Sequence, residues 1–444
     1  MTYLNIKQKY ILFFLLVGIF IVSLSYSFYF KIPPLVDARA YDTIAWHLAT
    51  GEGYREALDV PINQDNAIIR VGPGYEFFLA GIYYLFGHFI QIIWIIQALL
   101  LTASSFLIFL ISQEVFKERW NYKIGFISAL FIGLSPDLIT MQAMLMTETL
   151  GIFLAIITIY LFFRYYNSKK KSLFLASILG VSFGISVLVR TPLALLVIPF
   201  GVYFLYEKKW KHLVLFTVFS CLIFVPWTIR NWNVYHAFIP TNAASGFNFL
   251  VGNHKGANGE QEPYPILDEY VKQFGHIEAN KKATSDALNF ITTQPLEFLK
   301  LTFLRTSIYF SFARPTGFWF HLHGINKAVT LVTSALYATT IFIFGLWGIL
   351  AIRSLTHEEK KKAFYLLAML IMMPLALVGV VVETRYRFLV YPFFALFAGF
   401  GFNAFSQEKL SLKYTLILTG LLVLNTAFDI VRNFSRITER IHGL

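Results

Sequence analysis

Long apolar runs separated by short polar stretches recur along the whole chain. Most of them reach the length of roughly 17–25 residues that a helix needs to cross the hydrocarbon core of a bilayer. The runs lie near residues 10–30, 89–111, 124–140, 145–165, 173–189, 191–206, 213–229, 328–352, 363–382, 388–405 and 412–431. This pattern predicts an all-α polytopic membrane protein with about eleven transmembrane helices.

Short connections rich in lysine and arginine alternate with connections that carry few basic residues. The basic clusters are Lys117/Arg119/Lys123, Arg164/Lys169/Lys170/Lys171, Lys208/Lys209/Lys211, Arg353/Lys360/Lys361/Lys362 and Lys409/Lys413. Basic loops stay preferentially on the cytoplasmic side of a membrane. We therefore expect a multi-pass protein of the inner (plasma) membrane with a cytoplasmic N-terminus, and an odd number of spans would put the C-terminus outside.

Two longer polar segments remain on the outer side, 31–88 and 230–327. Neither is apolar enough to be an independent soluble domain, so residues 1–444 are interpreted as a single integral membrane domain. In the first segment, apolar residues recur at helical spacing from Val36 to Leu48 and predict a short helix. In the second, Lys300 and Arg305 interrupt an apolar run over residues 288–303, which favours a helix lying in the plane of the interface.

The composition agrees with a membrane protein. Of the 444 residues, 57% are hydrophobic and only 14% are charged, whereas soluble domains carry about 25% charged residues. The formal charge of +12 falls largely in the short loops, so membrane lipids rather than nucleic acid are the expected partners. The single cysteine, Cys221, lies within an apolar run and excludes an intramolecular disulfide.

Polar and ionisable residues gather at the outer ends of the predicted helices. Ionisable groups beside membrane spans are costly, and they are therefore candidates for function. The clusters are Asp37-x-x-x-Tyr41-Asp42 leading to Gly51-x-Gly53-Tyr54, Arg70-x-x-Pro73-Gly74-Tyr75, Thr147-Glu148, Arg190-Thr191-Pro192, Pro226-Trp227-x-x-Arg230-Asn231 and Glu383-Thr384-Arg385-Tyr386-Arg387. Their shared side predicts a polar cavity at the outer interface.

The order of these motifs over about residues 30–400 resembles the GT-C glycosyltransferases. It is most similar to the branch that contains the dolichyl-phosphate-mannose–protein mannosyltransferases and the aminoarabinose transferase of lipid A. The resemblance implies a GT-C-like helix bundle with in-plane helices in two outer loops. The sequence departs from the family pattern at Ala38, where an acidic residue is common, and at Glu76, where proline is common. These departures leave the acceptor type and a divalent metal ion open.

The resemblance implies that Asp37 is the catalytic base, that the donor is a polyprenyl-phosphate-linked sugar, and that transfer inverts the anomeric centre. Glycosyl transfer also needs positive charge beside the departing phosphate. One guanidinium group can bind two phosphate oxygens at once. The candidate donor-phosphate site therefore consists of Arg70, Arg385, Arg387 and Tyr386. Substrate contacts are expected from Tyr41, Asp42, Tyr75, Glu148 and Glu383. The acceptor is open among a glycan, a lipid and a protein.

Other interpretations of these residues stay open. Asp37 precedes a helix and suits an N-cap, and Asp42 is the rival base. Arg190 and Arg230 suit interfacial anchors at helix ends. His321-x-His323 has no carboxylate at ligand spacing, so no metal site is predicted there.

At the level of the whole protein, the alternatives are a lipid or solute transporter or flippase, and an outer-side polysaccharide polymerase or ligase. Transporters tend to carry internal repeats and polar residues near the bilayer midplane. Here the ionisable residues collect at one face, which favours a one-sided enzyme.

Overall fold

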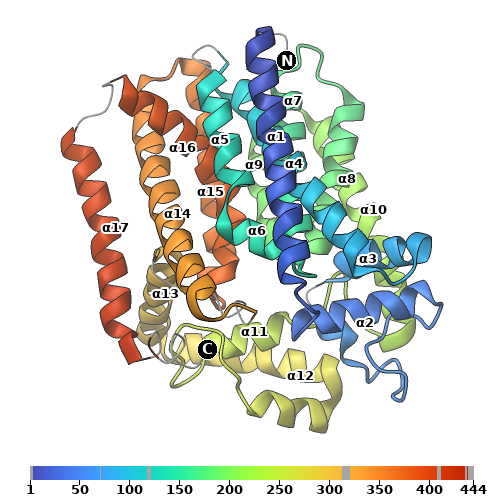
Figure 1. The fold of residues 1–444 in the computed structure, drawn as a ribbon. Coiled ribbons are helices and arrows are strands. Elements are labelled where there is room, and N and C mark those ends of the chain that lie inside the picture. Colours follow the sequence, from blue (N-terminus) through green and yellow to red (C-terminus); the bar gives the residue numbers. More distant parts are fainter. Residues whose placement is uncertain are drawn as a thin grey trace.

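The computed structural model describes residues 4–70, 72–117, 122–312, 321–407, 412–435 and 438. Within these ranges the chain is helical throughout, apart from loops and an isolated bridge between Glu260 and Val382. Figure 1 shows a bundle of long helices with further helices lying across its lower end. The prediction of an all-α polytopic protein is confirmed.

Among the described residues, eight helical segments are long and apolar enough to cross a membrane. They are α1 (Ile6–Phe30), α4 (Ile90–Val115), α7 (Thr147–Asn167), α10 (Trp210–Tyr235), α14 with η3 (Gly324–Ser354), α15 (His357–Val378), η4 with α16 (Thr384–Ser406) and α17 (Leu412–Arg432). The shorter apolar helices are α8 (Leu173–Val189) and η2 with α9 (Thr191–Tyr206). Together with the bent pair described next, these elements occupy the eleven predicted runs.

The run predicted as one helix over 124–140 is broken in the middle. It forms α5 (Tyr122–Gly133) and α6 (Pro136–Gln142), which meet at an angle of 51°. Pro136 occupies the first position of α6, where its missing N–H costs nothing, while its ring is incompatible with a continuous helix. The Ser135 side chain accepts a hydrogen bond from the Leu138 amide at 3.3 Å and so caps the new helix.

The basic loops lie together at the end of the bundle where α1 begins (Figure 1). The Glu114 carboxylate accepts hydrogen bonds from Arg164 at 3.0 Å and Asn167 at 2.6 Å. The Glu114 carbonyl accepts one from Lys362 at 3.0 Å, which joins three loops. The described members of the basic clusters therefore share one end, whereas Arg119 and Lys409 lie outside the described residues.

The outer layer is built from α2 (Asp37–Ala49), α3 (Pro73–Phe86), α11 (Ser245–Gly252), α12 (Ile266–Thr293) and α13 (Pro295–Phe310). In Figure 1, α2 and α12 lie across the lower end of the bundle, while α13 stands upright near α17. The prediction of a helix in the plane of the interface over residues 288–303 therefore holds for the end of α12 but not for α13. The cause is Pro295, which begins a new helix and holds Gln294 in a non-helical conformation.

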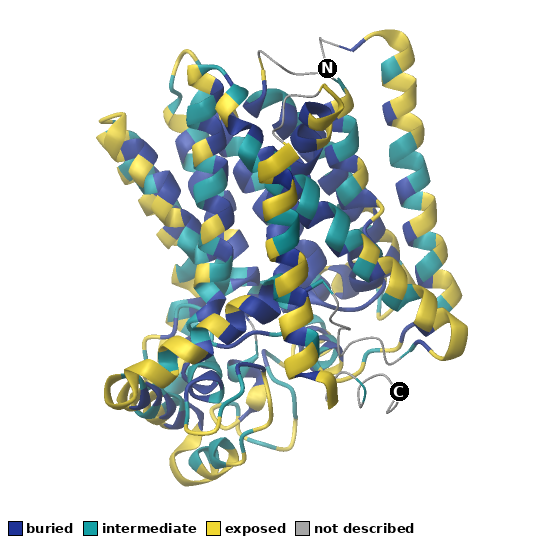
Figure 2. Cartoon of the chain, turned by 90° about the vertical axis from the view of Figure 1, so that its left-hand side faces the viewer, coloured by how far each residue is buried: buried dark blue, intermediate teal, exposed yellow. Residues whose placement is uncertain are grey.

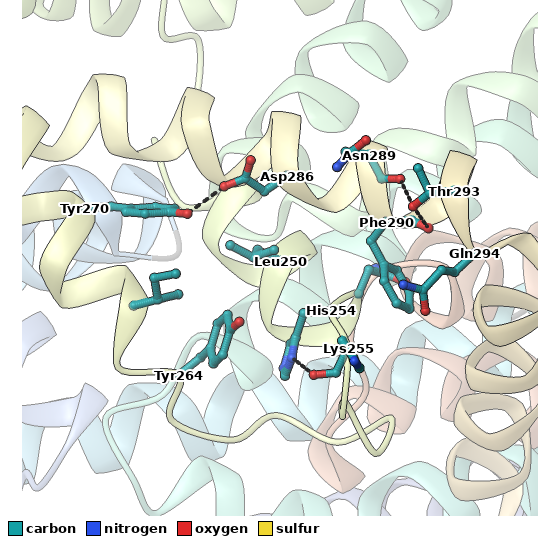
Figure 3. Close-up of a pocket in the computed structure, with 12 residues that line it drawn as sticks. Leu250, His254, Lys255, Tyr264, Tyr270, Asp286, Asn289, Phe290, Thr293 and Gln294 are labelled. Atoms are coloured by element: carbon teal, nitrogen blue, oxygen red, sulfur yellow. Dashed lines mark hydrogen bonds between the residues drawn. The ribbon is translucent and has the colours of Figure 1, made fainter.

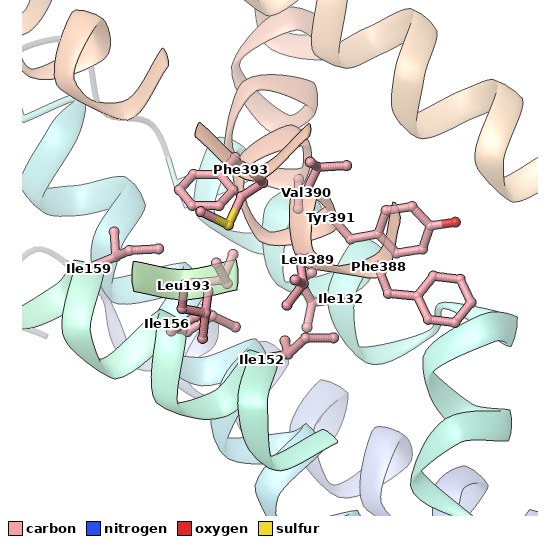
Figure 4. Close-up of a cluster of buried hydrophobic side chains, with 14 of the residues drawn as sticks. Ile132, Ile152, Ile156, Ile159, Leu193, Phe388, Leu389, Val390, Tyr391 and Phe393 are labelled. Carbon is pink, nitrogen blue, oxygen red and sulfur yellow. The ribbon is translucent and has the colours of Figure 1, made fainter. Parts of the chain in front are cut away.

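The bundle is most densely packed around η4 (Thr384–Val390) and α16 (Tyr391–Ser406). In the most apolar stretch of this segment 89% of the residues are buried, against 22% in α1, 17% in α10 and 22% in α17. Figure 2 shows the buried residues in the centre of the molecule and exposed residues on the peripheral helices. Figure 4 shows Phe388, Leu389 and Val390 of η4 among isoleucines of α5 and α7. This packing fixes the backbone that carries Arg385.

Helices α14 and α16 approach each other closely through glycine. A Cβ atom on Gly348 of α14 would overlap the Phe397 carbonyl oxygen of α16, and one on Gly401 would overlap the Phe344 carbonyl. Small residues allow such close backbone contact between membrane helices, where packing rather than the hydrophobic effect drives association.

We expect Gly348→Ala to lower the thermal unfolding midpoint of the detergent-solubilised protein. Overpacking of this kind costs about 1–3 kcal/mol, which outweighs the gain of about 1 kcal/mol in helix propensity. Gly420→Ala on α17 is the matched control, because nothing lies within 4 Å of its Cβ position. The close-contact interpretation is wrong if the two variants shift the midpoint equally.

Candidate active site

Asp37 and Arg385 lie 348 positions apart in the chain and form an ion pair at the outer end of the bundle. Arg385 Nη2 donates to Asp37 Oδ2 at 3.0 Å, and the two side chains are only 8% and 25% exposed. The N-cap of α2 is Val36, so Asp37 is the first helical residue and does not cap the helix. Its carboxylate is directed to the guanidinium of Arg385.

The backbone that precedes Asp37 is strained. Val36 has a φ of 53°, and a β-branched residue rarely adopts a positive φ. Such conformations cost on the order of 1–3 kcal/mol and persist where the surroundings hold them, often at functional sites. The Val36 turn sets the direction in which α2 begins, and thereby the position of Asp37.

Arg385 is shared between two carboxylates. Its Nε donates to Glu383 Oε2 at 2.9 Å while Nη2 contacts Asp37. Burial raises the pKa of Glu383 from its ordinary value, although the nearby Arg385 cation opposes that shift. The Arg385 guanidinium therefore pairs with two carboxyl groups in a site with little access to water.

A second ion pair lies beside the first. Arg190 Nη1 is 3.3 Å from Glu148 Oε1 and donates to Thr147 Oγ1 at 2.9 Å. The Tyr386 ring lies between the two cations, 5.8 Å from Arg190 Cζ and 5.5 Å from Arg385 Cζ. Arg190 is only 4% exposed, so the alternative of an interfacial anchor is wrong for this residue. The signal in the sequence was a lone arginine between two apolar runs.

Arg70 is held by the loop of the first outer segment. Its Nε and Nη2 donate to the Glu56 carboxylate at 3.0 Å and 2.7 Å. Asp65 organises that loop, because its oxygens accept from the amides of Glu56 and Ala57 at 2.8 Å each. Burial by itself would lower the pKa of Arg70, but its hydrogen bond to Glu56 and the nearby charges of Glu56 and Asp37 outweigh burial and raise that pKa.

Three other predicted residues of the first outer segment face different partners. The Tyr41 ring is buried edge-on against Tyr75 at 5.7 Å. The Tyr75 hydroxyl donates to Gln97 at 3.0 Å within the bundle. Asp42 accepts from the Tyr83 hydroxyl and pairs with His88 at 2.8 Å. Asp42 thus joins the end of α3 and is not part of the Asp37–Arg385 pair.

Arg387 points away from this site into the bundle. It is completely buried, donates to the Ser311 carbonyl at 2.6 Å and lies 3.8 Å from the Asp137 carboxylate. Asp137 also accepts from Tyr391 at 2.7 Å. The structure therefore groups Asp37, Glu383, Arg385, Tyr386 and Glu148, and separates them from Arg387.

Glu76, in the first turn of α3, is a buried acid that the sequence marked only as a departure from the family pattern. Its side chain is fully buried. Burial raises its pKa to about 8, and Tyr54 and Arg70 only partly offset the shift. The group is thus predominantly neutral at neutral pH.

No set of three or more His, Cys, Asp or Glu side chains within the described ranges is arranged to hold a metal ion. His321, one of the two histidines considered as a metal pair, has its Nε2 at 3.1 Å from the Tyr26 hydroxyl.

The apolar helices and the grouping of polar helix ends at one face describe a multi-pass membrane protein. Residues 70–229 match the dolichyl-phosphate-mannose-protein mannosyltransferase family. This is the family branch that the sequence motifs resemble, and the match covers a little over a third of the chain. None of the curated proteins compared has a matching sequence.

A solved structure of low sequence identity shares this architecture. The apo oligosaccharyltransferase from Archaeoglobus fulgidus aligns with a TM-score of 0.52 and 15% identity, over 97% of this chain and 55% of that one. This chain thus spans about half the length of that relative, and the likeness concerns the fold alone. ArnT from Cupriavidus metallidurans bound to undecaprenyl phosphate aligns with a TM-score of 0.37 and 16% identity, over 88% of this chain and 76% of that one.

We predict that Glu76 makes the folded protein less stable as the pH rises. Its pKa moves from 4.5 to about 8 on folding, so the stabilisation present below pH 4.5 is lost progressively up to about pH 8. Glu76→Gln removes this dependence, and its unfolding midpoint should exceed that of the wild type at about pH 9 and equal it near pH 5.

The measurement is the unfolding midpoint of both proteins in one detergent across this pH range. The exposed Glu52→Gln serves as the control and should follow the wild type at every pH. Parallel pH curves for wild type and Glu76→Gln would show that Glu76 is ionised in the folded protein.

Proposed function

We propose that the protein is a membrane glycosyltransferase that moves a sugar from a polyprenyl-phosphate-linked donor to an acceptor hydroxyl at the outer face of the membrane. The contact between Asp37 and Arg385 carries this proposal. This contact brings Asp37, the proposed base, together with Arg385, the proposed phosphate ligand, although they are far apart in the chain. The match of residues 70–229 to a family named for dolichyl-phosphate-mannose supports a lipid-linked donor.

In the proposed step, the Asp37 carboxylate accepts the proton of the acceptor hydroxyl. The acceptor oxygen then forms a bond to the anomeric carbon of the sugar. The bond from that carbon to the phosphate oxygen breaks, and its electron pair leaves with the polyprenyl phosphate. The products are the glycosylated acceptor, polyprenyl phosphate and a proton released later from Asp37. A single displacement of this kind inverts the anomeric centre.

Arg385 is the residue proposed to bind the departing phosphate. Glu383 already positions the guanidinium. The incoming phosphate would replace Asp37 as the partner of Arg385 Nη2. Such an exchange frees the Asp37 carboxylate to act as a base when the donor is bound. Arg70, near Asp37, is the second phosphate ligand, after exchange of its Glu56 partner.

The remaining predicted residues divide by their surroundings. Tyr386 and Glu148, next to the Arg385 and Arg190 guanidinium groups, are proposed to line the donor site. Tyr41 and Tyr75 support α2 from within the protein, and Asp42 fixes α2 to α3. Arg387 is proposed to position η4 through Asp137 and Ser311 and to take no part in phosphate binding.

The proposed orientation puts the basic loops in the cytoplasm and the Asp37–Arg385 site outside. It rests on the gathering of the basic clusters at the opposite end of the bundle from α2 and α12 (Figure 1). The acceptor hydroxyl would then be supplied from the outer face of the inner (plasma) membrane.

Asp37→Asn should abolish sugar transfer while the protein still folds. The amide cannot accept the proton, and the loss of a positioned base lowers rates by roughly 10²–10⁴-fold. Transfer is measured with purified protein in proteoliposomes and a radiolabelled polyprenyl-phosphate sugar. Asp42→Asn, on the same helix, should retain far more activity. If Asp42→Asn is the inactive variant and Asp37→Asn is active, the base assignment is reversed.

Arg385→Ala should weaken binding of undecaprenyl phosphate, because a charge-assisted contact to phosphate contributes about 1.5–3 kcal/mol. This corresponds to roughly a 10- to 150-fold higher Kd. Binding is measured by native mass spectrometry or microscale thermophoresis in one detergent, and Asp37→Asn should bind at least as well as the wild type. The control is Arg164→Ala, whose guanidinium lies at the basic end of the bundle. Absence of any polyprenyl-phosphate binding by the wild type would instead favour the transporter class.

A further inference from the structure

A polar cavity of about 220 Å³ lies in the outer layer, outside the ion-pair site. It is formed where α12 folds back on itself over α11. Gly275 has a φ of 72° inside α12, a conformation that glycine adopts without strain, and the chain reverses there. The Tyr270 hydroxyl on the first arm donates to Asp286 on the second arm at 2.7 Å and ties the two arms together.

The lining combines flat aromatic rings with polar groups, of which Asp286 and Lys255 carry charge (Figure 3). Tyr264 stacks on His254 with ring centroids 4.0 Å apart and an angle of 10° between the planes, which makes a rigid aromatic platform. The side-chain amides of Asn289 and Gln294 line the cavity and form no hydrogen bond with other described residues. These amides offer both donors and acceptors to a ligand.

This chemistry favours a sugar ring over other ligands. A pyranose presents an apolar C–H face that an aromatic ring can cover, and a rim of hydroxyls that amides and carboxylates can bind. The cavity is smaller than the roughly 300–1,000 Å³ of pockets for drug-sized molecules, so it suits one ring. Among the described residues that line the cavity, Lys255 is the one lysine or arginine, which is unlike a phosphate site, and the polar groups argue against a lipid chain.

The wall of the cavity is joined to the backbone that carries Arg385. Asn253, in the lining, donates to the carbonyls of Gly379 and Val380 at 3.1 Å and 3.2 Å. The buried Arg305 donates to the Asn253 side chain at 3.0 Å and to the Val380 carbonyl at 2.6 Å. Residues 379–382 lead directly into Glu383, so Asn253 links the cavity to the segment that carries Arg385.

Two further contacts join the loop at residues 260–261 to the ion-pair site. The Tyr386 hydroxyl donates to the Gln261 side chain at 2.6 Å, and Glu260 forms a bridge with Val382. A ligand held between α11 and α12 would therefore be anchored to the same rigid segment as the guanidinium of Arg385.

We propose that this cavity, between α11 and α12, binds one pyranose unit of the acceptor, so that the acceptor is a glycan or a glycolipid. The proposal rests on the proposed function and deepens it by naming the acceptor class. The Tyr264–His254 platform covers one face of the sugar, and Asn289, Gln294 and Asp286 bind its hydroxyl groups. The acceptor is recognised through this ring while another hydroxyl of the same molecule reaches Asp37.

The test is saturation-transfer NMR on the full-length protein in lipid nanodiscs, with the methyl glycosides of glucose, galactose, mannose and N-acetylglucosamine as probes. At least one probe should receive saturation from the wild type. Tyr264→Ala should weaken its binding roughly three- to tenfold, the range that one aromatic contact contributes. Asn289→Ala should weaken it as well. Phe238→Ala, an exposed aromatic residue outside the cavity, should bind like the wild type.

Tyr264→Phe keeps the ring and should keep most of the binding, which guards against a folding defect in the alanine variant. The proposal is overturned if no probe binds the wild type, or if Tyr264→Ala and Phe238→Ala bind equally. Undecaprenyl-phosphate binding is recorded on the same samples. Carrier binding without glycoside binding overturns the saccharide site and leaves the proposed function standing. Glycoside binding without carrier binding supports the saccharide site and contradicts the lipid-linked donor.

Discussion

The guanidinium of Arg385, shared between Asp37 and Glu383, is the interaction on which the outer half of the structure depends. Removing these charges from water costs several kcal/mol for each ion, which only close and well-directed contacts can offset. The contacts are 3.0 Å and 2.9 Å long. They require α2 to begin at one place, which the strained Val36 turn achieves, and they require η4 to be rigid, which the apolar packing of Phe388 and Leu389 achieves.

This arrangement leaves an excess of negative charge around a few cations. Asp37, Glu383 and Glu148 face Arg385 and Arg190, with the Tyr386 ring between the two guanidinium groups. The phosphodiester of an incoming polyprenyl-phosphate sugar adds one charge of the same sign, so in the proposed function it binds by displacing a carboxylate from a guanidinium. Displacement of Asp37 is the change that produces a free base. Phosphate binding and activation of the base would thus be one event, and no separate conformational switch is needed.

Much of the fold follows from local sequence, and much of the site does not. Apolar runs locate the helices that could cross a membrane, because a bilayer demands a minimum length of apolar helix. The break at Pro136 and the upright α13 after Pro295 were missed, since apolar content hides a helix break within a run. Within Arg385-Tyr386-Arg387 the sequence gives two equivalent arginines. Only the 3-10 helix that places one toward Asp37 and the other toward Asp137 distinguishes them.

The connection between the outer cavity and the ion-pair site bears on how such an enzyme can be selective. In the proposed function, the Arg385 site supplies a base and a phosphate ligand, which acceptors of different structure would share. Selectivity must therefore come from contacts made away from the reacting atoms. Arg305 and Asn253 join the α11–α12 layer to residues 379–380, and Gln261 joins it to Tyr386. In the proposed function, an acceptor bound to that layer is positioned relative to Asp37 through residues 379–382. These residues lead into Glu383, which orients Arg385.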